Sequence, residues 1–475
     1  MSQWSHNGAG EGAGSDAASV ADLLGENPFF NRGAIQDPEY FYDRRRETRR
    51  ALRMLSKRQC VSVIGPRKIG KTSLLFHLCR PEVMLEHGLD PAHCVMVYVN
   101  CEDLGHLGRE ELYALLLGEI ADSVVRHGCK IEVPERPVTH LEFERAVGKV
   151  FDRGLNLVLL FDEFELLSEN PNLGAAFFSS LRALPTRYGL AYLTSSRRPL
   201  LGLPQTEDYS PFFNIFVPLK LGLFDKASSR EVIEASLAKV GARLPAPTVD
   251  SVLEYGGGHP FFLQVAGYWA LELQETKGAP LETRDMALLR QSMRGQIESH
   301  FEYYWGHLDP RARFVVAALP LTQQEARFRE EIELLESMCL VVRTDSRPES
   351  GYRYFSPLFR DYVRRQSVEG LLQAGPFVLD LANGRVMQHE RLLSLSGSQH
   401  ALFTYLMQRQ GQVISSQELD REALSVPGEA YEYLSDERLK SAIKGLRRAL
   451  GVDASCIENR RGIGYVFRVR SAQGE

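Results

Sequence analysis

One short segment limits the folds open to this chain more than any other feature. Residues 65–72 read Gly-Pro-Arg-Lys-Ile-Gly-Lys-Thr, which fits the spacing GxxxxGK(S/T). An apolar stretch at 59–64 precedes the segment, and an apolar helical stretch at 74–78 follows it. A strand, a glycine-rich turn and a helix in this order direct backbone N–H groups and a helix N-terminus at one anion. The segment therefore predicts a phosphate-binding loop within an α/β domain.

The polar residues of this loop have distinct expected roles. Lys71 is expected to reach the β- and γ-phosphates of a nucleotide, and the Thr72 hydroxyl is expected to bind Mg²⁺. The alternative is an ordinary glycine-rich turn, which the flanking strand and helix disfavour. The predicted nucleotide-binding residues of this segment are Gly65, Pro66, Arg67, Lys68, Ile69, Gly70, Lys71, Thr72 and Ser73.

A second apolar stretch ends in two carboxylates. Residues 157–161 are followed directly by Asp162 and Glu163. Because the carboxyl ends of parallel strands meet at one edge of a sheet, both acids are expected beside the phosphate-binding loop. Asp162 is then the predicted Mg²⁺ ligand, and Glu163 the group that polarises the attacking water. The alternative is that these acids cap a strand or begin a helix.

The next apolar stretch ends in hydroxyl groups. Thr194 and the two serines after it are candidate γ-phosphate sensors, and an ordinary helix N-cap is their alternative. Arg197 and Arg198 are candidates for binding phosphate charge or are surface arginines. The aromatic side chains at 303–305 are expected to pack in the core, and a base-stacking platform is their alternative.

Domain organisation follows from length and from changes in pattern. At 475 residues the chain suggests about three domains of roughly 150 residues each. Its seven cysteines include no CxxC pair, and no run of about eighteen apolar residues occurs, so we expect a cytoplasmic protein without a membrane span. Strands at 59–64, 95–99, 155–161 and 189–194 alternate with helices, which predicts a parallel sheet. The expected units are a disordered tail at 1–26, the α/β domain at 27–224, helices at 225–299, a region with a β-hairpin at 300–370, and a last unit at 375–475.

The last unit reverses the charge of the chain. The whole chain carries a net charge of -5, but residues 436–470 contain nine Lys or Arg against four Asp or Glu. A predicted helix buries a stripe that begins at Leu439, and a predicted hairpin follows it. A basic helix beside an arginine-bearing wing is typical of a DNA reader, whereas a solvated charged helix is the alternative. The predicted DNA-binding residues are Arg438, Lys440, Lys444, Arg447, Arg448, Arg460 and Arg461.

Five segments together resemble STAND-type AAA ATPases, which are signal-transducing P-loop NTPases. They are Asn-Pro-Phe at 27–29, Tyr-Phe-Tyr-Asp-Arg at 40–44, the loop at 65–73, Leu-Leu-Phe-Asp-Glu-Phe-Glu at 159–165 and Gly-Gly-His-Pro-Phe-Phe-Leu-Gln at 257–264. This resemblance implies ATP or ADP as the nucleotide, slow hydrolysis, and a helical lid in which Pro260 packs near the adenine. The family often has glycine where Asp43 stands.

The last unit resembles the winged-helix effector domain of OmpR/PhoB-type response regulators. The matching segments are Leu395-Ser396 with Gln399, residues 411–419, residues 435–448 and Arg-Gly-Ile-Gly-Tyr at 461–465. The expected fold class is therefore α/β: a P-loop AAA-type nucleotide-binding domain with a helical lid, followed by two winged-helix domains. The earlier winged region, at 300–366, lacks a comparable basic helix and is expected to pack within the molecule.

Together the resemblances imply an ATP-dependent signal-transducing switch that binds double-stranded DNA through its C-terminal winged helix, as a transcription regulator. They imply a compact ADP state, ATP-dependent self-association after an unidentified signal, and resetting by hydrolysis at Glu163. The alternatives are an antiviral-defence or mobile-element ATPase that recognises DNA, and an initiator or loader ATPase.

Overall fold

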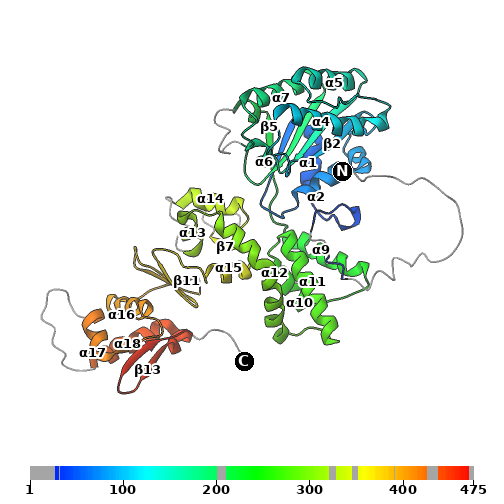
Figure 1. The fold of residues 1–475 in the computed structure, drawn as a ribbon. Coiled ribbons are helices and arrows are strands. Elements are labelled where there is room, and N and C mark those ends of the chain that lie inside the picture. Colours follow the sequence, from blue (N-terminus) through cyan, green and yellow to red (C-terminus); the bar gives the residue numbers. More distant parts are fainter. Residues whose placement is uncertain are drawn as a thin grey trace.

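The computed structural model describes residues 27–30, 33–200, 210–319, 328–344, 351–389, 391–424 and 437–469. The tail expected to be disordered, residues 1–26, lies outside these ranges. An α/β domain, a helical lid, a first winged region and a C-terminal unit follow one another along the chain (Figure 1). Within the described ranges no helix is long and apolar enough to cross a membrane.

A five-stranded parallel sheet forms the centre of the α/β domain. Its strands lie in the order β2-β3-β4-β1-β5. In the inner strand β3 (Asn156–Asp162), Leu159 packs on one face of the sheet and Leu160 on the other, since successive side chains of a strand point to opposite faces. The other strands are β1 (Cys60–Ile64), β2 (Cys94–Asn100), β4 (Leu190–Ser196) and β5 (Phe216–Lys220).

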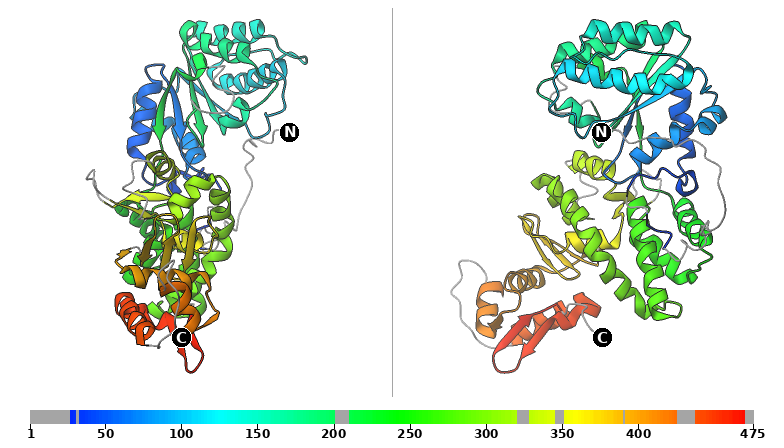
Figure 2. Two further views of the ribbon diagram at one scale, coloured as in Figure 1. Left: turned by 90° about the vertical axis from the view of Figure 1, so that its left-hand side faces the viewer. Right: turned by 45° about the vertical axis from the view of Figure 1, so that its right-hand side comes forward.

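Helices cover both faces of this sheet (Figure 2). One face packs against α1 (Arg45–Leu55), α2 (Lys71–Leu78) and α3 (Pro81–Glu86). The other face packs against α4 (Arg109–Val124), α5 (His140–Asp152), α6 (Phe164–Ser168), α7 (Ala175–Arg187) and α8 (Ser210–Phe213). Both layers have their own apolar core, as the nearly continuous apolar sequence of the inner strands requires.

Four of the five strands lie where the sequence predicts them, and β5 was missed. This strand contains Pro218 and is only partly buried along its length, so neither an apolar run nor a regular alternation marks it. It lies at the edge of the sheet, paired only with β1 among its described neighbours, where a proline is tolerated.

Four helices form the lid: α9 (Lys226–Lys239), α10 (Ala246–Gly256), α11 (Pro260–Lys277) and α12 (Met286–Gly306). The 21 residues of α12 run through the boundary expected at 299/300, so one helix belongs to both the lid and the first winged region.

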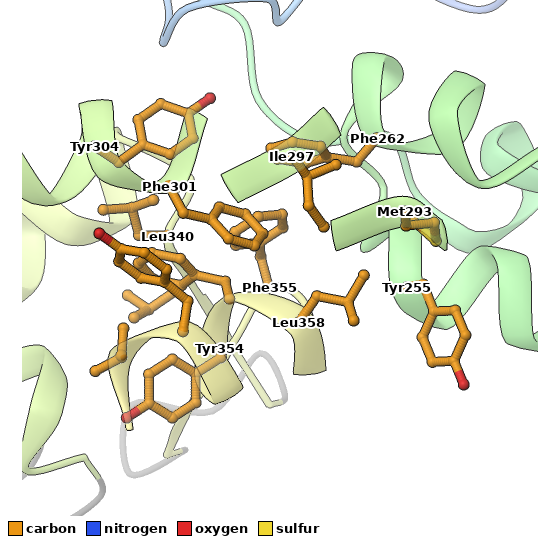
Figure 3. Close-up of a cluster of buried hydrophobic side chains, with 14 of the residues drawn as sticks. Tyr255, Phe262, Met293, Ile297, Phe301, Tyr304, Leu340, Tyr354, Phe355 and Leu358 are labelled. Carbon is orange, nitrogen blue, oxygen red and sulfur yellow. The ribbon is translucent and has the colours of Figure 1, made fainter. Parts of the chain in front are cut away.

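The first winged region shares its hydrophobic core with the lid (Figure 3). Phe355 stacks on Phe262 of α11 with ring centroids 5.6 Å apart, and Phe301 of α12 lies 5.3 Å from Phe359. This confirms the expected internal packing role of the region. Its elements are α13 (Pro310–Ala317), α14 (Arg329–Ser337), β6 (Val341–Arg343), β7 (Tyr352–Tyr354) and α15 (Pro357–Val363).

In the described part of the C-terminal unit, two antiparallel sheets combine with three α-helices. Its first sheet already begins at Leu371, before the expected start at 375, and has the order β11-β10-β9-β8. Its strands are β8 (Leu371–Ala374), β9 (Phe377–Asp380), β10 (Arg385–Gln388) and β11 (Arg391–Leu393). The remaining elements are α16 (Gly397–Gln408), β12 (Val413–Ser415), α17 (Ser416–Leu419), α18 (Glu437–Leu450), β13 (Ile457–Arg460) and β14 (Gly464–Phe467).

Candidate nucleotide site and nucleic-acid interface

The phosphate-binding loop connects β1 to α2, as its sequence predicts. At Gly65 a Cβ atom would lie 2.8 Å from Ile69 Cγ2 and 2.9 Å from the Leu221 carbonyl oxygen, so a side chain does not fit there. Gly70 has a φ of 101°, a conformation that favours glycine, and the helix begins at the next residue. The loop therefore favours glycine at Gly65 because of close contacts and at Gly70 because of its backbone conformation.

The Lys71 ammonium lies inside the loop that precedes it. It is 4% exposed and donates to the carbonyl oxygens of Gly65, at 3.2 Å, and Pro66, at 3.4 Å. Its Nζ also lies 3.6 Å from Glu163 Oε1. This places a buried positive charge next to the carboxylate that the sequence predicts to polarise water.

Glu163 is held between two cations. Its Oε2 lies 3.0 Å from the Arg197 guanidinium, and its backbone φ is 52°. Burial acts to raise the pKa of Glu163, but Lys71 and Arg197 outweigh burial and lower it. The carboxylate is therefore ionised at neutral pH, as a group that accepts a proton from water must be.

Glu165 behaves in the opposite way. Burial, with the neighbouring charge of Glu163 as the next cause, raises the pKa of Glu165 to about 7. Its Oε1 accepts from the backbone N–H of Arg197 at 3.2 Å, whereas its buried Oε2 lacks a hydrogen-bond partner among the described residues. Two acids that lie two residues apart in the chain thus have different protonation behaviour.

Asp162 and Thr194 lie deeper than the sequence suggested. Asp162 is 3% exposed and accepts hydrogen bonds from the Tyr98 hydroxyl, at 2.9 Å, and from the Ser195 hydroxyl. Thr194 is fully buried within β4, opposite Ser62 of β1. Of the three residues at the end of β4, Ser195 is the one that contacts both acids, because its Oγ also accepts from the Glu163 backbone N–H at 3.1 Å. The metal role of Asp162 and the sensor role of Thr194 stay predictions.

A cavity of about 270 Å³ opens beside the loop. It brings together Glu163, Arg197 and the loop residues Arg67 to Ser73, and the lid adds Pro260. Of the predicted site residues, Gly65, Pro66, Asp162 and Thr194 do not line it. The lining residues that sequence reasoning did not single out individually are Gly33, Ala34, Ile35, Tyr40, Phe41, Tyr42, Arg44, Glu102, Phe224, Val232, Phe261 and Gln264.

The segment before α1 reaches this cavity because of its backbone conformation. Asp43 and Arg44 have φ values of 58° and 60°, the left-handed region in which glycine is favoured. Glycine at the position of Asp43 would adopt this conformation at a lower cost. The buried Arg44 guanidinium donates to the carbonyl oxygens of Gly222, at 2.7 Å, and Ile69, at 3.2 Å, which fastens this segment to the loop.

Residues 303–305 of helix α12 pack in the hydrophobic core, as expected, and two of them also contact the site. The Tyr303 hydroxyl accepts from Arg197 Nη1 at 2.8 Å, and the Tyr304 hydroxyl donates to the Arg67 carbonyl oxygen at 3.1 Å. The Tyr304 hydroxyl also lies 3.3 Å from His259 Nε2. Burial lowers the pKa of His259 to about 3, so this imidazole is neutral. The helix that leads into the first winged region therefore touches both the phosphate-binding loop and the partner of Glu163.

In the C-terminal unit the predicted basic residues separate into two groups. The stripe Leu439, Ile443, Leu446 and Leu450 is buried, as predicted, and the side chains of Lys440, Lys444 and Arg448 are exposed on the rest of α18. Two other arginines bond within the unit: Arg438 donates to the Leu424 carbonyl oxygen, and Arg447 to that of Ile457 at 2.6 Å.

The hairpin of β13 and β14 forms where it was predicted. Arg460 and Arg461 are exposed at its turn, and Arg460 pairs with Glu458 at 2.9 Å. An exposed basic helix face and a basic wing thus lie in one unit, while Arg438 and Arg447 contribute to holding that unit together.

Comparison with known proteins decides the family. The family described as Novel STAND NTPase 2 matches residues 56–319, which is more than half of the chain. The chain belongs to this family. A second description, transcriptional regulatory protein, C terminal, matches residues 388–467 of this STAND NTPase. A comparison with curated proteins gives no match.

One solved structure supports the fold of the STAND NTPase, and two others are reported as similar chains. A Walker-type ATPase of Pyrococcus abyssi is 19% identical with a TM-score of 0.51, over 71% of this chain and 99% of that one. The ORC2 protein of Aeropyrum pernix, in ADPNP and ADP complexes, is 17% identical with a TM-score of 0.48, over 71% and 96%. The DNA-binding domain of CpxR from E. coli is 26% identical with a TM-score of 0.18, over 21% and 95%.

Proposed function

We propose that this STAND NTPase is a nucleotide-dependent switch that binds ATP or ADP with Mg²⁺ and regulates transcription by binding DNA through its C-terminal winged helix. Lys71 would hold the phosphates, and Thr72 and Asp162 would hold the metal, which neutralises phosphate charge when bound. Glu163 would polarise the attacking water, and ATP hydrolysis is slow because that carboxylate must first leave Arg197.

The observation that carries the switch is the hydrogen bond from Arg197 to Tyr303. Arg197 lines the cavity, pairs with Glu163 at 3.0 Å and donates to the Tyr303 hydroxyl at 2.8 Å. A nucleotide phosphate that attracts this guanidinium competes for it with both Glu163 and Tyr303. Because α12 also packs in the core of the first winged region, a change at the phosphate site that moves Tyr303 would alter the packing of that region.

The direction of the change follows from linkage. A nucleotide shifts the equilibrium between two conformations only by the ratio of its affinities for them. A ligand with a γ-phosphate has more charge to offer Arg197 than ADP has. We therefore expect ATP to favour a conformation in which Tyr303 has released Arg197, and ADP to favour the conformation described here.

The test measures DNA binding in both nucleotide states. Anisotropy of labelled genomic fragments is recorded with ADP and with a non-hydrolysable ATP analogue, for the wild type and for Tyr303→Phe, which keeps the ring and removes the hydroxyl. We expect the analogue to strengthen wild-type binding and Tyr303→Phe to bind DNA equally in both states. Tyr188→Phe is the matched control, because it also removes a hydroxyl that bonds a charged side chain, Glu144, away from the cavity.

The DNA contacts are tested separately with Arg460→Ala/Arg461→Ala and with Lys444→Ala/Arg448→Ala across salt. Each lost phosphate contact lowers the slope of log K against log salt by about 0.9. Arg391→Ala, an exposed arginine of β11, serves as the control. DNA binding that ignores the nucleotide would overturn the switch. Absence of DNA binding by the wild type in both nucleotide states would remove DNA from the proposal and leave the C-terminal unit as a protein-interaction domain.

A further inference from the structure

Gln264 has an unused acceptor next to the candidate nucleotide site. It lies on α11 one turn after Pro260, lines the cavity and is 5% exposed. Its Oε1 is buried and has no hydrogen-bond partner among the described residues. A buried carbonyl oxygen without a donor costs free energy, and native proteins seldom leave one so. A bound molecule that brings a donor would satisfy it.

The walls around Gln264 suit a flat ring. The lid contributes Val232, Pro260 and Phe261 to the cavity, and the segment before α1 contributes Ile35 and Tyr42. These five side chains are apolar or aromatic, whereas the cations of the same cavity are Arg67, Lys68 and Lys71 of the loop together with Arg44 and Arg197. An aromatic base would make apolar contacts with these walls. Few side chains there could form hydrogen bonds with its polar edge.

We propose that Gln264 Oε1 accepts a hydrogen bond from the 6-amino group of adenine and thereby sets the base preference of the site. The proposal rests on the nucleotide binding proposed above. An amide offers an acceptor and a donor side by side, which matches the amino group and N7 of adenine. Guanine presents O6 and N7, both acceptors, on that edge, so the amide oxygen would stay without a donor.

The experiment removes the proposed hydrogen bond in two ways, once by omitting the 6-amino group of the ligand and once by replacing Gln264. Fluorescent ADP bound to the full-length protein is displaced by ADP, by GDP and by purine riboside diphosphate, which lacks the 6-amino group. For the wild type we expect ADP to bind about three- to tenfold tighter than the riboside diphosphate, the range of one hydrogen bond. For Gln264→Leu we expect the two to bind within about twofold of each other.

Two further variants make the result specific. Gln274→Leu is the matched control: Gln274 lies on the same helix, its Oε1 is also buried without a partner among the described residues, and it does not line the cavity. We expect it to keep the wild-type ratio. Gln264→Glu keeps an acceptor at this position, so it should keep the preference for the amino group and discriminate more strongly against GDP. It provides the test if Gln264→Leu does not fold.

The outcomes separate the two proposals. A wild-type ratio of ADP to riboside diphosphate retained in Gln264→Leu, with normal binding of both, overturns the role of Gln264 and leaves nucleotide binding intact. A wild type that binds none of the three nucleotides overturns the proposed nucleotide site, and the role of Gln264 with it. Loss of the preference in Gln264→Leu alone supports the assignment.

Discussion

At the scale of single residues, the ion pairs of Glu163 organise the site. Lys71 and Arg197 both pair with this carboxylate, and its backbone lies in the left-handed region that non-glycine residues rarely adopt. Such strain persists only where the surroundings over-determine it, and it concentrates at functional sites. The carboxylate is thus held in place by its neighbours before any nucleotide binds.

Glu163→Gln is expected to lower the rate of ATP hydrolysis by about 100-fold or more, the usual contribution of a general base. Nucleotide affinity should stay equal or rise, because Lys71 and Arg197 lose a competing negative charge. Phosphate release and displacement of fluorescent ADP measure the two effects. A variant that hydrolyses ATP at the wild-type rate would exclude Glu163 as the base.

The raised pKa of Glu165 makes the free energy of unfolding depend on pH, and the direction of this dependence can be worked out. Its folded pKa, raised to about 7, exceeds the value of 4.5 expected in the unfolded chain. Unfolding therefore releases a proton between pH 4.5 and 7, so the free energy of unfolding falls as the pH rises through this window. The lowered pKa of Glu163 affects the free energy of unfolding only at pH values below this window.

Glu165→Gln should remove that loss of stability, on the order of 1–3 kcal/mol between pH 5 and 7.5. The amide keeps an oxygen that can accept from the Arg197 backbone N–H, so the local fold is retained. Urea titrations of both proteins across this range measure the difference. Equal pH dependence in the two proteins would contradict a protonated Glu165.

At the scale of elements, the turn between α10 and α11 fixes the lid against the first winged region. Gly257 has a φ of 57°, and a Cβ atom there would lie 2.1 Å from the Phe355 carbonyl oxygen. Gly278, which ends α11, has a similar φ of 65°, but nothing lies within 4 Å of its Cβ position. A side chain would thus meet similar backbone strain at both glycines, but only at Gly257 would it also clash with a neighbouring element.

Gly257→Ala should therefore destabilise the protein by about 1–3 kcal/mol more than Gly278→Ala, since only the former forces two packed elements apart. Thermal unfolding compares the two variants, and hydrogen exchange should show faster exchange in α11 and α15 only for Gly257→Ala. Equal melting temperatures would mean that the lid and the winged region move apart freely.

At the scale of the whole molecule, the first sheet of the C-terminal unit joins two cores. Val378 and Met387 pack in the core shared by the lid and the first winged region. Their strand neighbours Phe377 and Val386 pack in the core of the C-terminal unit. The period of two in a strand thus places one sheet between the part that contacts the nucleotide cavity and the part with the basic helix.

Met387→Ala should weaken the packing of this sheet on the first winged region, at a cost of about 2–4 kcal/mol. We expect DNA binding to persist and its dependence on nucleotide to decline, as measured by anisotropy with ADP and the ATP analogue. Val386→Ala is the paired control on the opposite face, and it should lower DNA affinity in both nucleotide states. Unchanged nucleotide dependence in Met387→Ala would exclude this route of coupling.

The sequence by itself determined the features that depend on near neighbours in the chain. The glycine spacing at 65–72, the two acids at the end of β3 and the apolar stripe of α18 follow from local hydrogen bonding and helical or strand period. Only the tertiary structure decided that Gln264 lines the cavity while Asp162 and Thr194 do not, that Tyr303 accepts a hydrogen bond from Arg197, and that Arg438 and Arg447 bond within their own unit. These depend on which distant segments pack together, and no local pattern of polarity specifies that choice.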